Sequence, residues 1–225
     1  EVNHYEIGVK TSPFTNSILN FTLYNTDIKN YQTQVQSPEL GVNRGYLANA
    51  EGVRVRGAEL DASIFVNKNF NLNGAISYTE GIYTDFKNAP LPLEETGAPV
   101  AFKDISGSDL PGISRWAGTL GGEYSNPGKL FGNNGKYFVG LDAFYRSDFS
   151  SSPSPSIYLV VPSYALFNAR VGFRVSDGLS VFAWGRNIFD KDYYEQLLPA
   201  GGNAGQYAAV LGDQRTFGIT LKYSL

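Results

Sequence analysis

The sequence predicts an all-β protein, an antiparallel up-and-down transmembrane β-barrel, and three observations lead there. Apolar and polar residues alternate with a period of two along segments that are long enough to cross a bilayer. The links between these segments are alternately short and long, which places the long loops at one end of the sheet. The composition agrees, because only 17% of the 225 residues are charged, while 14% are aromatic and 25 are glycine.

Nine segments carry the strand pattern. In chain order they are roughly Asn3–Lys10, Ser17–Tyr31, Gly52–Val66, Phe70–Asp85, Ile113–Tyr124, Tyr137–Phe149, Ser163–Val175, Leu179–Phe189 and Gln214–Leu225. The last one shows the pattern best, since Phe217, Ile219 and Leu221 share one face and Thr216, Gly218 and Thr220 share the other.

The third segment changes phase near Gly57. Its apolar residues lie at odd positions before this glycine, at Val53 and Val55, and at even positions after it, within Ala58–Ile64. A β-bulge inserts one residue into a strand and shifts its alternation by one. The sequence therefore predicts a bulge at Gly57.

The connections differ in length in a regular way. Short links are expected at Ser12–Asn16, Asn67–Asn69 and Ser176–Gly178. Long ones, rich in Gly, Pro, Ser and Asn, are expected at Gln32–Glu51, Phe86–Gly112, Ser150–Pro162 and Asp190–Asp213. The turn at Asn126–Lys136 is longer than this rule predicts. Short periplasmic turns and long extracellular loops are typical of transmembrane barrels.

Composition excludes several functions. The formal net charge is −3, which argues against nucleic acid as a partner. Cysteine is absent, so disulfides, thiolate catalysis and Cys-ligated zinc are excluded. The single histidine, His4, could bind a metal with Asn3 and Glu6, but a polar residue that faces the barrel lumen is the favoured interpretation. We therefore expect no catalytic residue, no cofactor and no resident metal.

The start of the sequence is unusual. It begins at Glu1 and contains no methionine, and nine strands are an odd number, whereas a complete bacterial barrel has an even number. We therefore expect further strands upstream of this chain.

Five motifs, in order, resemble those of TonB-dependent outer-membrane receptors. Asn187–Tyr193 reads Asn-Ile-Phe-Asp-Lys-Asp-Tyr, close to the family's Asn-Leu-Phe-Asp-Lys-x-Tyr, and Gly212–Tyr223 is similar to its final strand, Gly-x-x-Arg-Thr-Phe-Gly-x-Thr-Leu-x-Tyr. Tyr5–Lys10, Gly57–Asp61 and Leu110–Trp116 resemble its Tyr-Glu-x-Gly-x-Lys, Gly-x-Glu-x-Glu and Leu-Pro-x-x-Pro-x-x segments. The resemblance runs over essentially the whole chain. One departure is Leu225, where such barrels usually end in Phe.

This resemblance implies an architecture and a function. Residues 1–225 would be the C-terminal portion of the barrel, its last nine strands of 22, with the plug domain, the TonB box and the earlier strands outside them. The whole receptor would sit in the outer membrane of a Gram-negative bacterium, among its lipids. It would bind a scarce substrate, a ferric siderophore or another iron complex, and take it up with energy from a TonB-type protein acting at the plug. Haem, cobalamin and oligosaccharide are alternative cargoes.

Two other classes remain open from the residues alone. One is a small autonomous outer-membrane barrel of porin or adhesin type, against which the odd strand number argues. The other is a soluble β-sandwich binding module, against which the order of the motifs argues. Aromatic residues near strand ends also favour a membrane wall, since they resemble interfacial girdles: Tyr78, Tyr83, Phe86, Tyr124, Tyr137, Tyr145, Phe149 and Tyr223.

Four loop residues are the candidates for ligand binding: Tyr158, Tyr194, Gln206 and Tyr207. Tyrosine and glutamine suit flat, oxygen-rich chelates, because they offer stacking and hydrogen bonds. Anchoring at the membrane interface would explain the tyrosines equally well.

Other polar groups have simpler interpretations. Asp142 and Asp148, with Arg146 between them, would line one face of the sixth strand, as a cross-strand ion-pair ladder rather than a translocation surface. Glu94-Glu95 and the serine-rich run Ser150–Ser156 are expected to be solvated.

Overall fold

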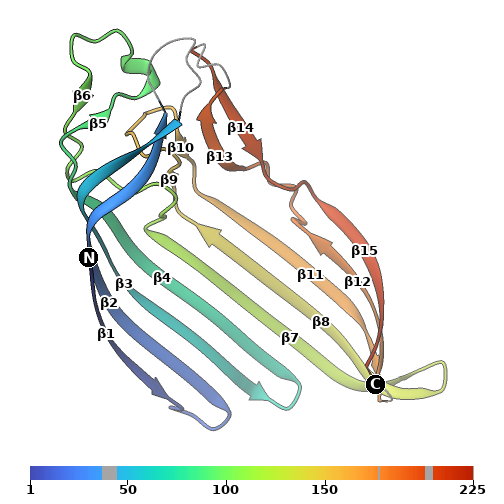
Figure 1. The fold of residues 1–225 in the computed structure, drawn as a ribbon. Helices are drawn as coiled ribbons and strands as arrows, with labels where there is room; N and C mark the ends of the chain where they lie inside the picture. Colours follow the sequence, from blue (N-terminus) through green and yellow to red (C-terminus); the bar gives the residue numbers. More distant parts are fainter. Residues whose placement is uncertain (37–44, 177, 201–204, 225) are drawn as a thin grey trace.

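A computed structural model describes residues 1–36, 45–176, 178–200 and 205–224. The chain forms one nine-stranded antiparallel sheet, in the order β1-β2-β3-β4-β7-β8-β11-β12-β15 (Figure 1). Its strands are β1 Val2–Thr11, β2 Ser17–Gln36, β3 Gly45–Asn67, β4 Phe70–Asp85, β7 Trp116–Leu130, β8 Asn133–Arg146, β11 Tyr164–Val175, β12 Leu179–Arg186 and β15 Thr216–Tyr223. The order of these nine strands in the sheet is the same as their order in the chain, so the predicted up-and-down topology is confirmed.

Shorter elements lie in the connections at one end of this sheet (Figure 1). They are β5 Ala89–Pro90, the 3-10 turn η1 Leu93–Glu95, β6 Phe102–Lys103, β9 Phe149–Ser150, β10 Val160–Val161, β13 Tyr194–Pro199 and β14 Tyr207–Leu211. The small strands form three two-stranded sheets, and in the described residues no second large sheet packs on the first, as a sandwich would require. The fold is a partial barrel. No described helix is long and apolar enough to cross a membrane.

The turns at the opposite end are all short. The prediction of a longer turn at Asn126–Lys136 is wrong. The strands β7 and β8 continue through this segment and are joined by Phe131 and Gly132 alone. Both residues have positive φ, 49° and 83°, as in a two-residue type I′ hairpin. Asp177 in the last predicted short turn and Leu225 at the end of the last predicted strand lie outside the described residues.

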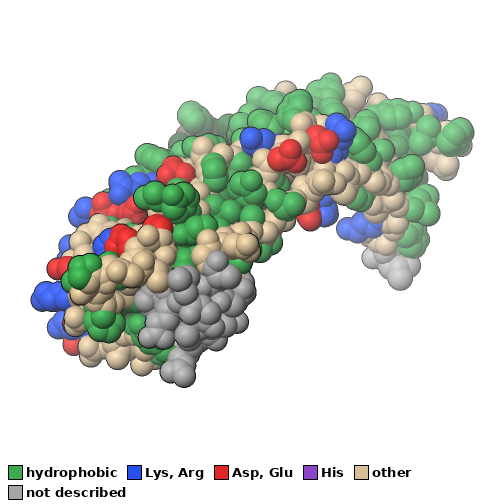
Figure 2. Space-filling view, turned by 90° about the horizontal axis from the view of Figure 1, so that it is seen from above, with side chains coloured by type: hydrophobic (Ala, Val, Ile, Leu, Met, Phe, Trp, Pro, Cys, Tyr) green, Lys and Arg blue, Asp and Glu red, His purple; other side chains and the backbone are tan. Residues whose placement is uncertain are grey.

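The convex face of the sheet is largely apolar, and many hydrophobic side chains lie along the upper right margin of Figure 2. The register places Ile7 beside Leu23 and Ile219 beside Ala183 on this face. Ile219 is 79% exposed and Leu221 72%. Soluble monomers rarely expose so continuous an apolar surface, so this face is the one that suits lipid.

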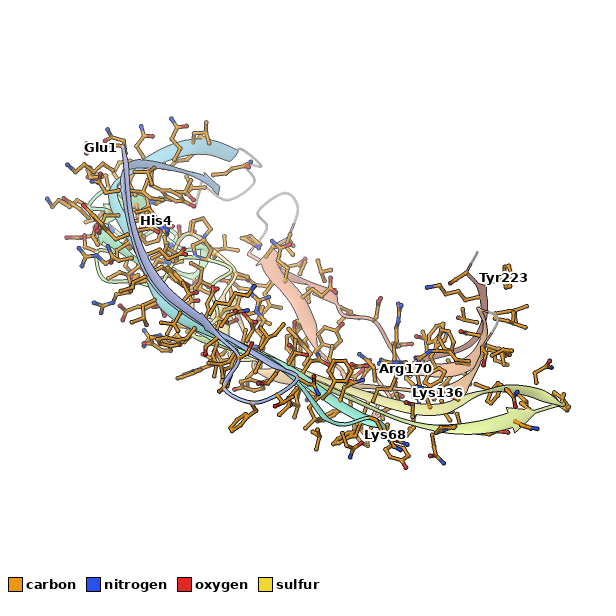
Figure 3. All side chains as sticks on the ribbon, turned by 90° about the horizontal axis from the view of Figure 1, so that it is seen from below. Glu1, His4, Lys68, Lys136, Arg170 and Tyr223 are labelled. Carbon is orange, nitrogen blue, oxygen red and sulfur yellow. The ribbon has the colours of Figure 1, made fainter. Side chains whose placement is uncertain are left out.

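The concave face carries the charges, and Figure 3 shows Arg170 on the inner side of the arc. Arg170 contacts Asp142 at 2.5 Å and Glu123 at 3.4 Å, and Arg174 contacts Glu123 at 2.9 Å. The predicted cross-strand ladder is therefore confirmed for Asp142, which pairs with Arg170 on β11, and Arg170 extends it to Glu123 on β7.

The ladder prediction is wrong for the other two residues of the sixth strand. Asp148 lies beyond the end of β8. Arg146 turns to the loops instead, where its Nε donates to Ser114 Oγ at 2.6 Å and its guanidinium lies 3.6 Å from the Phe149 ring centre.

The bulge predicted at Gly57 is also wrong. Gly57 pairs with Tyr24 on one side and Thr79 on the other, and the register is continuous through it. The alternation of β3 therefore stays in phase at Gly57. What changes there is the environment of each face of the strand. After Gly57 in the chain, the even positions face outward to lipid. Before it, the even residues Arg54 and Arg56 also face outward, but they form ion pairs with Asp27 and Glu80.

The odd residues Val53 and Val55, which come before Gly57 in the chain, face an apolar interior instead. There Val53 packs with Ala50, Tyr83, Phe86, Ala89, Ile105 and Leu110 in a buried core. This core lies beneath the connection between β4 and β7, outside the membrane wall. It corrects the girdle prediction for Tyr83 and Phe86, which are 0% and 1% exposed. Tyr78 fits that prediction, because its ring packs on Trp116 at 4.9 Å on the outer face.

Candidate ligand-binding site

Three loop segments meet above the sheet and form what we call the cap. They are the β5–η1–β6 segment, the β9–β10 loop and the β13–β14 hairpin (Figure 1). Side chains of one segment bond to another segment at several points, so the cap is a folded unit. Its construction decides which residues a ligand could reach.

Glu94 joins all three segments. Its carboxylate accepts hydrogen bonds from Ser156 Oγ at 3.0 Å, from the backbone N–H of Ile157 at 3.0 Å and from the hydroxyl of Tyr207 at 2.7 Å. The expectation that Glu94 is merely solvated is therefore wrong. Its neighbour Glu95 forms an ion pair with Lys103 at 2.6 Å.

The protonation of this cluster follows from its contacts. Partial burial acts to raise the pKa of Glu94, but the backbone bond of its own residue and those from Tyr207, Ser156 and Ile157 outweigh it, and the net pKa is lowered. Burial first, and then the bond to the Glu94 carboxylate, raise the pKa of Tyr207 to about 12. At neutral pH an ionised carboxylate therefore accepts a bond from a protonated phenol.

Tyr158 and Tyr207 form an aromatic pair beside this carboxylate. Their ring centres are 5.2 Å apart with a tilt of 38°. The Tyr158 side chain is 54% exposed, so one face of the pair is open to an incoming molecule. The two rings can stack on a flat ligand, and the fixed carboxylate can accept a hydrogen bond from it.

The serine-rich run is part of the cap's structure, so the prediction of a solvated spacer is wrong. Ser154 is buried and donates to the carbonyl of Pro90 at 3.1 Å. Ser151 Oγ donates to the carbonyl of Leu197 at 2.5 Å and accepts from its N–H at 3.2 Å. A hollow of about 250 Å³ remains between these segments, lined among others by Gln34, Leu91, Leu159 and Leu198.

The four predicted ligand residues do not form one cluster. Tyr158 and Tyr207 come together, whereas Tyr194 lines a different hollow beside Tyr164 and Tyr193. Gln206 is exposed next to Tyr207, and its backbone carbonyl accepts from Ala200 N–H at 2.9 Å. Their role in ligand binding stays a prediction.

One structural residue of the site was missed. Asn187 is 4% exposed, has a φ of 48° and holds both ends of the long β12–β15 connection. Its Nδ2 donates to the carbonyls of Lys191 and Asp213 at 2.9 and 3.1 Å, and its Oδ1 accepts from Lys191 N–H at 2.9 Å. The Asn-Ile-Phe-Asp-Lys motif, which begins at this residue, was the signal that could have identified it.

His4 contacts two polar side chains. Its Nδ1 lies 2.8 Å from Thr26 Oγ1, and its Nε2 lies 3.5 Å from Glu6. In the part of the chain that the structure describes, no three His, Cys, Asp or Glu side chains form a group that could hold a metal ion.

Comparisons with known proteins agree with this architecture. A family model described as "TonB dependent receptor-like, beta-barrel" matches residues 1–188. The chain is 25% identical over 222 residues to the ferric-pyoverdine M114 receptor PbuA of Pseudomonas sp. (strain M114), which covers 97% of this chain and 24% of that receptor.

Solved structures share the fold. The ferric yersiniabactin uptake receptor FyuA from Yersinia pestis matches with a TM-score of 0.73 at 15% identity, over 97% of this chain and 29% of that one. The copper transporter OprC matches with a TM-score of 0.72 at 16% identity, over 99% of this chain and 31% of that one. The chain thus spans about a quarter to a third of the length of these relatives.

Proposed function

The chain belongs to the TonB-dependent receptor β-barrel family, and on that premise we propose that residues 1–225 form the C-terminal portion of the barrel of an outer-membrane uptake receptor. The plug domain and the earlier strands of the wall would lie in other parts of that receptor. The intact barrel would sit in the outer membrane of a Gram-negative bacterium. Its energy would come from a TonB-type protein that acts on the plug.

The observation that carries this proposal is the cap on top of a family-type wall. The Tyr158–Tyr207 pair and the Glu94 carboxylate lie on the loop side of the sheet, where a ligand from outside would arrive first. The wall below contributes an apolar outer face and a charged inner face, as a plugged or wet lumen requires. None of these groups has the arrangement of a hydrolytic site.

A ferric siderophore or another iron complex is the proposed cargo. PbuA is named as a ferric-pyoverdine receptor and FyuA as a ferric yersiniabactin receptor, which supports an iron chelate. Such chelates are flat and rich in oxygen, so tyrosine faces and hydroxyls suit them. We propose that Tyr158 and Tyr207, with Gln206 next to Tyr207, contact the chelate, whereas Tyr194 lines a different hollow and is not part of this site.

A copper complex is the second candidate cargo, because OprC, with nearly the same TM-score, is named as a copper transporter. Both cargoes can be tested in one experiment. Cells that express the full-length receptor as their only uptake route are given radioactive iron or copper in a panel of chelates, and the accumulated metal is counted.

The variants decide whether the cap is the binding site. Tyr158→Ala and Tyr207→Ala should reduce uptake of the cognate chelate, while Tyr223→Ala, which removes a tyrosine 63% exposed at the far end of the wall, should not. Uptake without any dependence on TonB would contradict the receptor proposal. Normal uptake by both cap variants would leave the receptor proposal standing and remove the site.

A further inference from the structure

Two hollows lie along the same three strands near the C-terminal edge of the sheet. The outer groove has about 540 Å³ on the convex face, lined chiefly by Ala169, Val171, Ala183, Gly185, Phe217 and Ile219. The rim hollow has about 460 Å³ and is lined chiefly by Tyr164, Lys191, Asp192, Tyr193, Tyr194 and Gln214. Neither belongs to the Tyr158–Tyr207 cluster.

The two hollows follow each other in the same direction along β11, β12 and β15. Along β11 the chain passes from Tyr164 in the rim hollow to Ala169 in the outer groove. At the start of β15 the chain passes from Gln214 in the rim hollow to Phe217 in the outer groove. After β12 it runs the other way, from Ile188 in the outer groove to Lys191 in the rim hollow. Because these strands are antiparallel, the rim hollow lies on the loop side of the outer groove in all three cases.

The rim hollow has a rigid aromatic side. The Tyr193 ring packs on Tyr164 with 4.6 Å between ring centres. Its other side lies against Gly212, where a Cβ atom would come within 2.0 Å of the ring. The Tyr193 hydroxyl accepts from the N–H of Asp213 at 3.2 Å. The ring therefore needs no reordering when a ligand arrives.

Polar side chains complete the rim hollow. The side chains of Lys191, Asp192 and Gln214 make no hydrogen bond to any residue that the structure describes, so their ammonium, carboxylate and amide groups can serve a ligand. A tyrosine face suits the C–H face of a sugar ring, and these polar groups suit its hydroxyls. The volume lies within the range of small-molecule sites.

A cation lies at the junction of the two hollows. Arg215 follows Gln214 of the rim hollow, and its guanidinium lies 5.8 Å from the ring centre of Phe217, which lines the outer groove. Arg215 forms an ion pair with Asp190 at 3.4 Å. The side chains of Arg215 and Asp190 are 43% and 51% exposed, so the pair is open to solvent. Arginine at such a position suits a phosphate group.

We propose that the two hollows together bind one phosphorylated glycolipid of the surrounding outer leaflet. Its acyl chain lies in the outer groove, its phosphate near Arg215 and its sugar against the tyrosines of the rim hollow. Along the strands, the apolar groove is followed by the cation and then by the polar, aromatic hollow. A membrane glycolipid has its acyl chain, phosphate and sugar in the same order. This binding is independent of the cargo, because it uses the outside of the wall and its rim.

The test measures lipid binding to the full-length receptor, purified in detergent and stripped of lipid. Rough-type lipopolysaccharide, phosphatidylethanolamine and the free core oligosaccharide are titrated, and bound molecules are counted by native mass spectrometry. We expect tight binding of the lipopolysaccharide alone. Equal binding of phosphatidylethanolamine would show that the sugar is not recognised, and equal binding of the free oligosaccharide would show that the lipid is not needed; either result overturns the proposal.

Matched variants locate the site. Tyr194→Ala in the rim hollow and Ala183→Phe in the outer groove should each weaken lipopolysaccharide binding roughly tenfold, which corresponds to about 1.4 kcal/mol. Tyr158→Ala in the cap and Ala143→Phe elsewhere on the convex face serve as controls and should leave binding unchanged. Unshifted heat-modifiable migration in gels checks that each barrel is folded. Equal losses in controls and test variants would overturn the proposed location.

Discussion

The hydroxyl of Tyr207 donates a 2.7 Å hydrogen bond to the carboxylate of Glu94, 113 residues earlier in the chain. This bond crosses from the β13–β14 hairpin to the segment between β5 and β6. Since the same carboxylate also accepts from Ser156 and Ile157, a single side chain is bonded to two other loops at once.

Glu94→Gln should loosen the cap. Hydrogen bonds to a charged group contribute about 1.5–3 kcal/mol, and the amide keeps the shape but loses the charge and one acceptor oxygen. We expect hydrogen exchange at the amide of Ile157 to become at least about tenfold faster, measured by mass spectrometry on the folded receptor.

Glu95→Gln is the matched control for that experiment. It removes only the ion pair with Lys103, in which the side chains are 40% and 35% exposed, and surface pairs of this kind contribute about 0–1 kcal/mol. Exchange at Ile157 should stay within about threefold of the unsubstituted protein. Equal acceleration in both variants would mean that Glu94 is not the joining residue.

The cap should have a defined pH window. The pKa of Glu94 is lowered in the folded cap, so its contribution is present above the ordinary value of about 4.5 and is lost as the pH falls through the lower folded pKa. The pKa of Tyr207 is raised to about 12, so its contribution is present below the ordinary value of about 10 and is lost as the pH rises through about 12. Protection of Ile157, corrected for intrinsic exchange rates, should be constant from pH 5 to about 9 and decrease in acid. Loss of protection between pH 6 and about 8 would contradict this assignment.

Glu123→Gln should destabilise the wall. Glu123 is 13% exposed and contacts both Arg170 and Arg174, so its removal leaves two cations with less compensation. We expect a loss of about 2 kcal/mol, seen as a lower midpoint of heat-induced unfolding in detergent. Glu59→Gln, on the same inner face but without an ion pair among the described residues, should change the midpoint little. Adding Arg174→Gln to Glu123→Gln should recover part of the loss, and a further decrease would contradict the explanation.

Asn187→Asp should release the ends of the β12–β15 connection. The carboxylate keeps the oxygen that accepts from Lys191 N–H but cannot donate to the carbonyls of Lys191 and Asp213. Leaving such groups unpaired costs about 1–3 kcal/mol. We expect faster proteolysis within residues 190–213 of the folded receptor. The exposed Asn49→Asp is the control, and equal cleavage rates in the two variants would argue against the role given to Asn187.

The wall could be predicted from the sequence because its signal is local. A period of two appears in each strand by itself, and neighbouring strands in a meander pair in chain order. Strand ends were less accurate: β2 continues to Gln36 and β3 begins at Gly45, both inside the loop expected at Gln32–Glu51. There the strands leave the lipid but keep their hydrogen bonds.

The cap could not be predicted, because its contacts join residues that are far apart and ordinary in composition. Nothing in the local sequence separates Glu94, which joins three loops, from a solvated carboxylate. Ser154, in a run that looks like a flexible spacer, is buried against Pro90. Such contacts depend on loop geometry that the alternation of a strand does not encode.

The two faces of β3 change surroundings at Gly57, and this limits how the length of the strand can change in evolution. Adding or deleting one residue in the upper part of β3 would turn Arg54 and Arg56 into the apolar core and Val53 outward, because each step reverses the two faces. Adding or deleting two residues would preserve both faces. Relatives with a taller or shorter cap should therefore differ from this chain by even numbers of residues in this strand, with matching changes in β2 and β4.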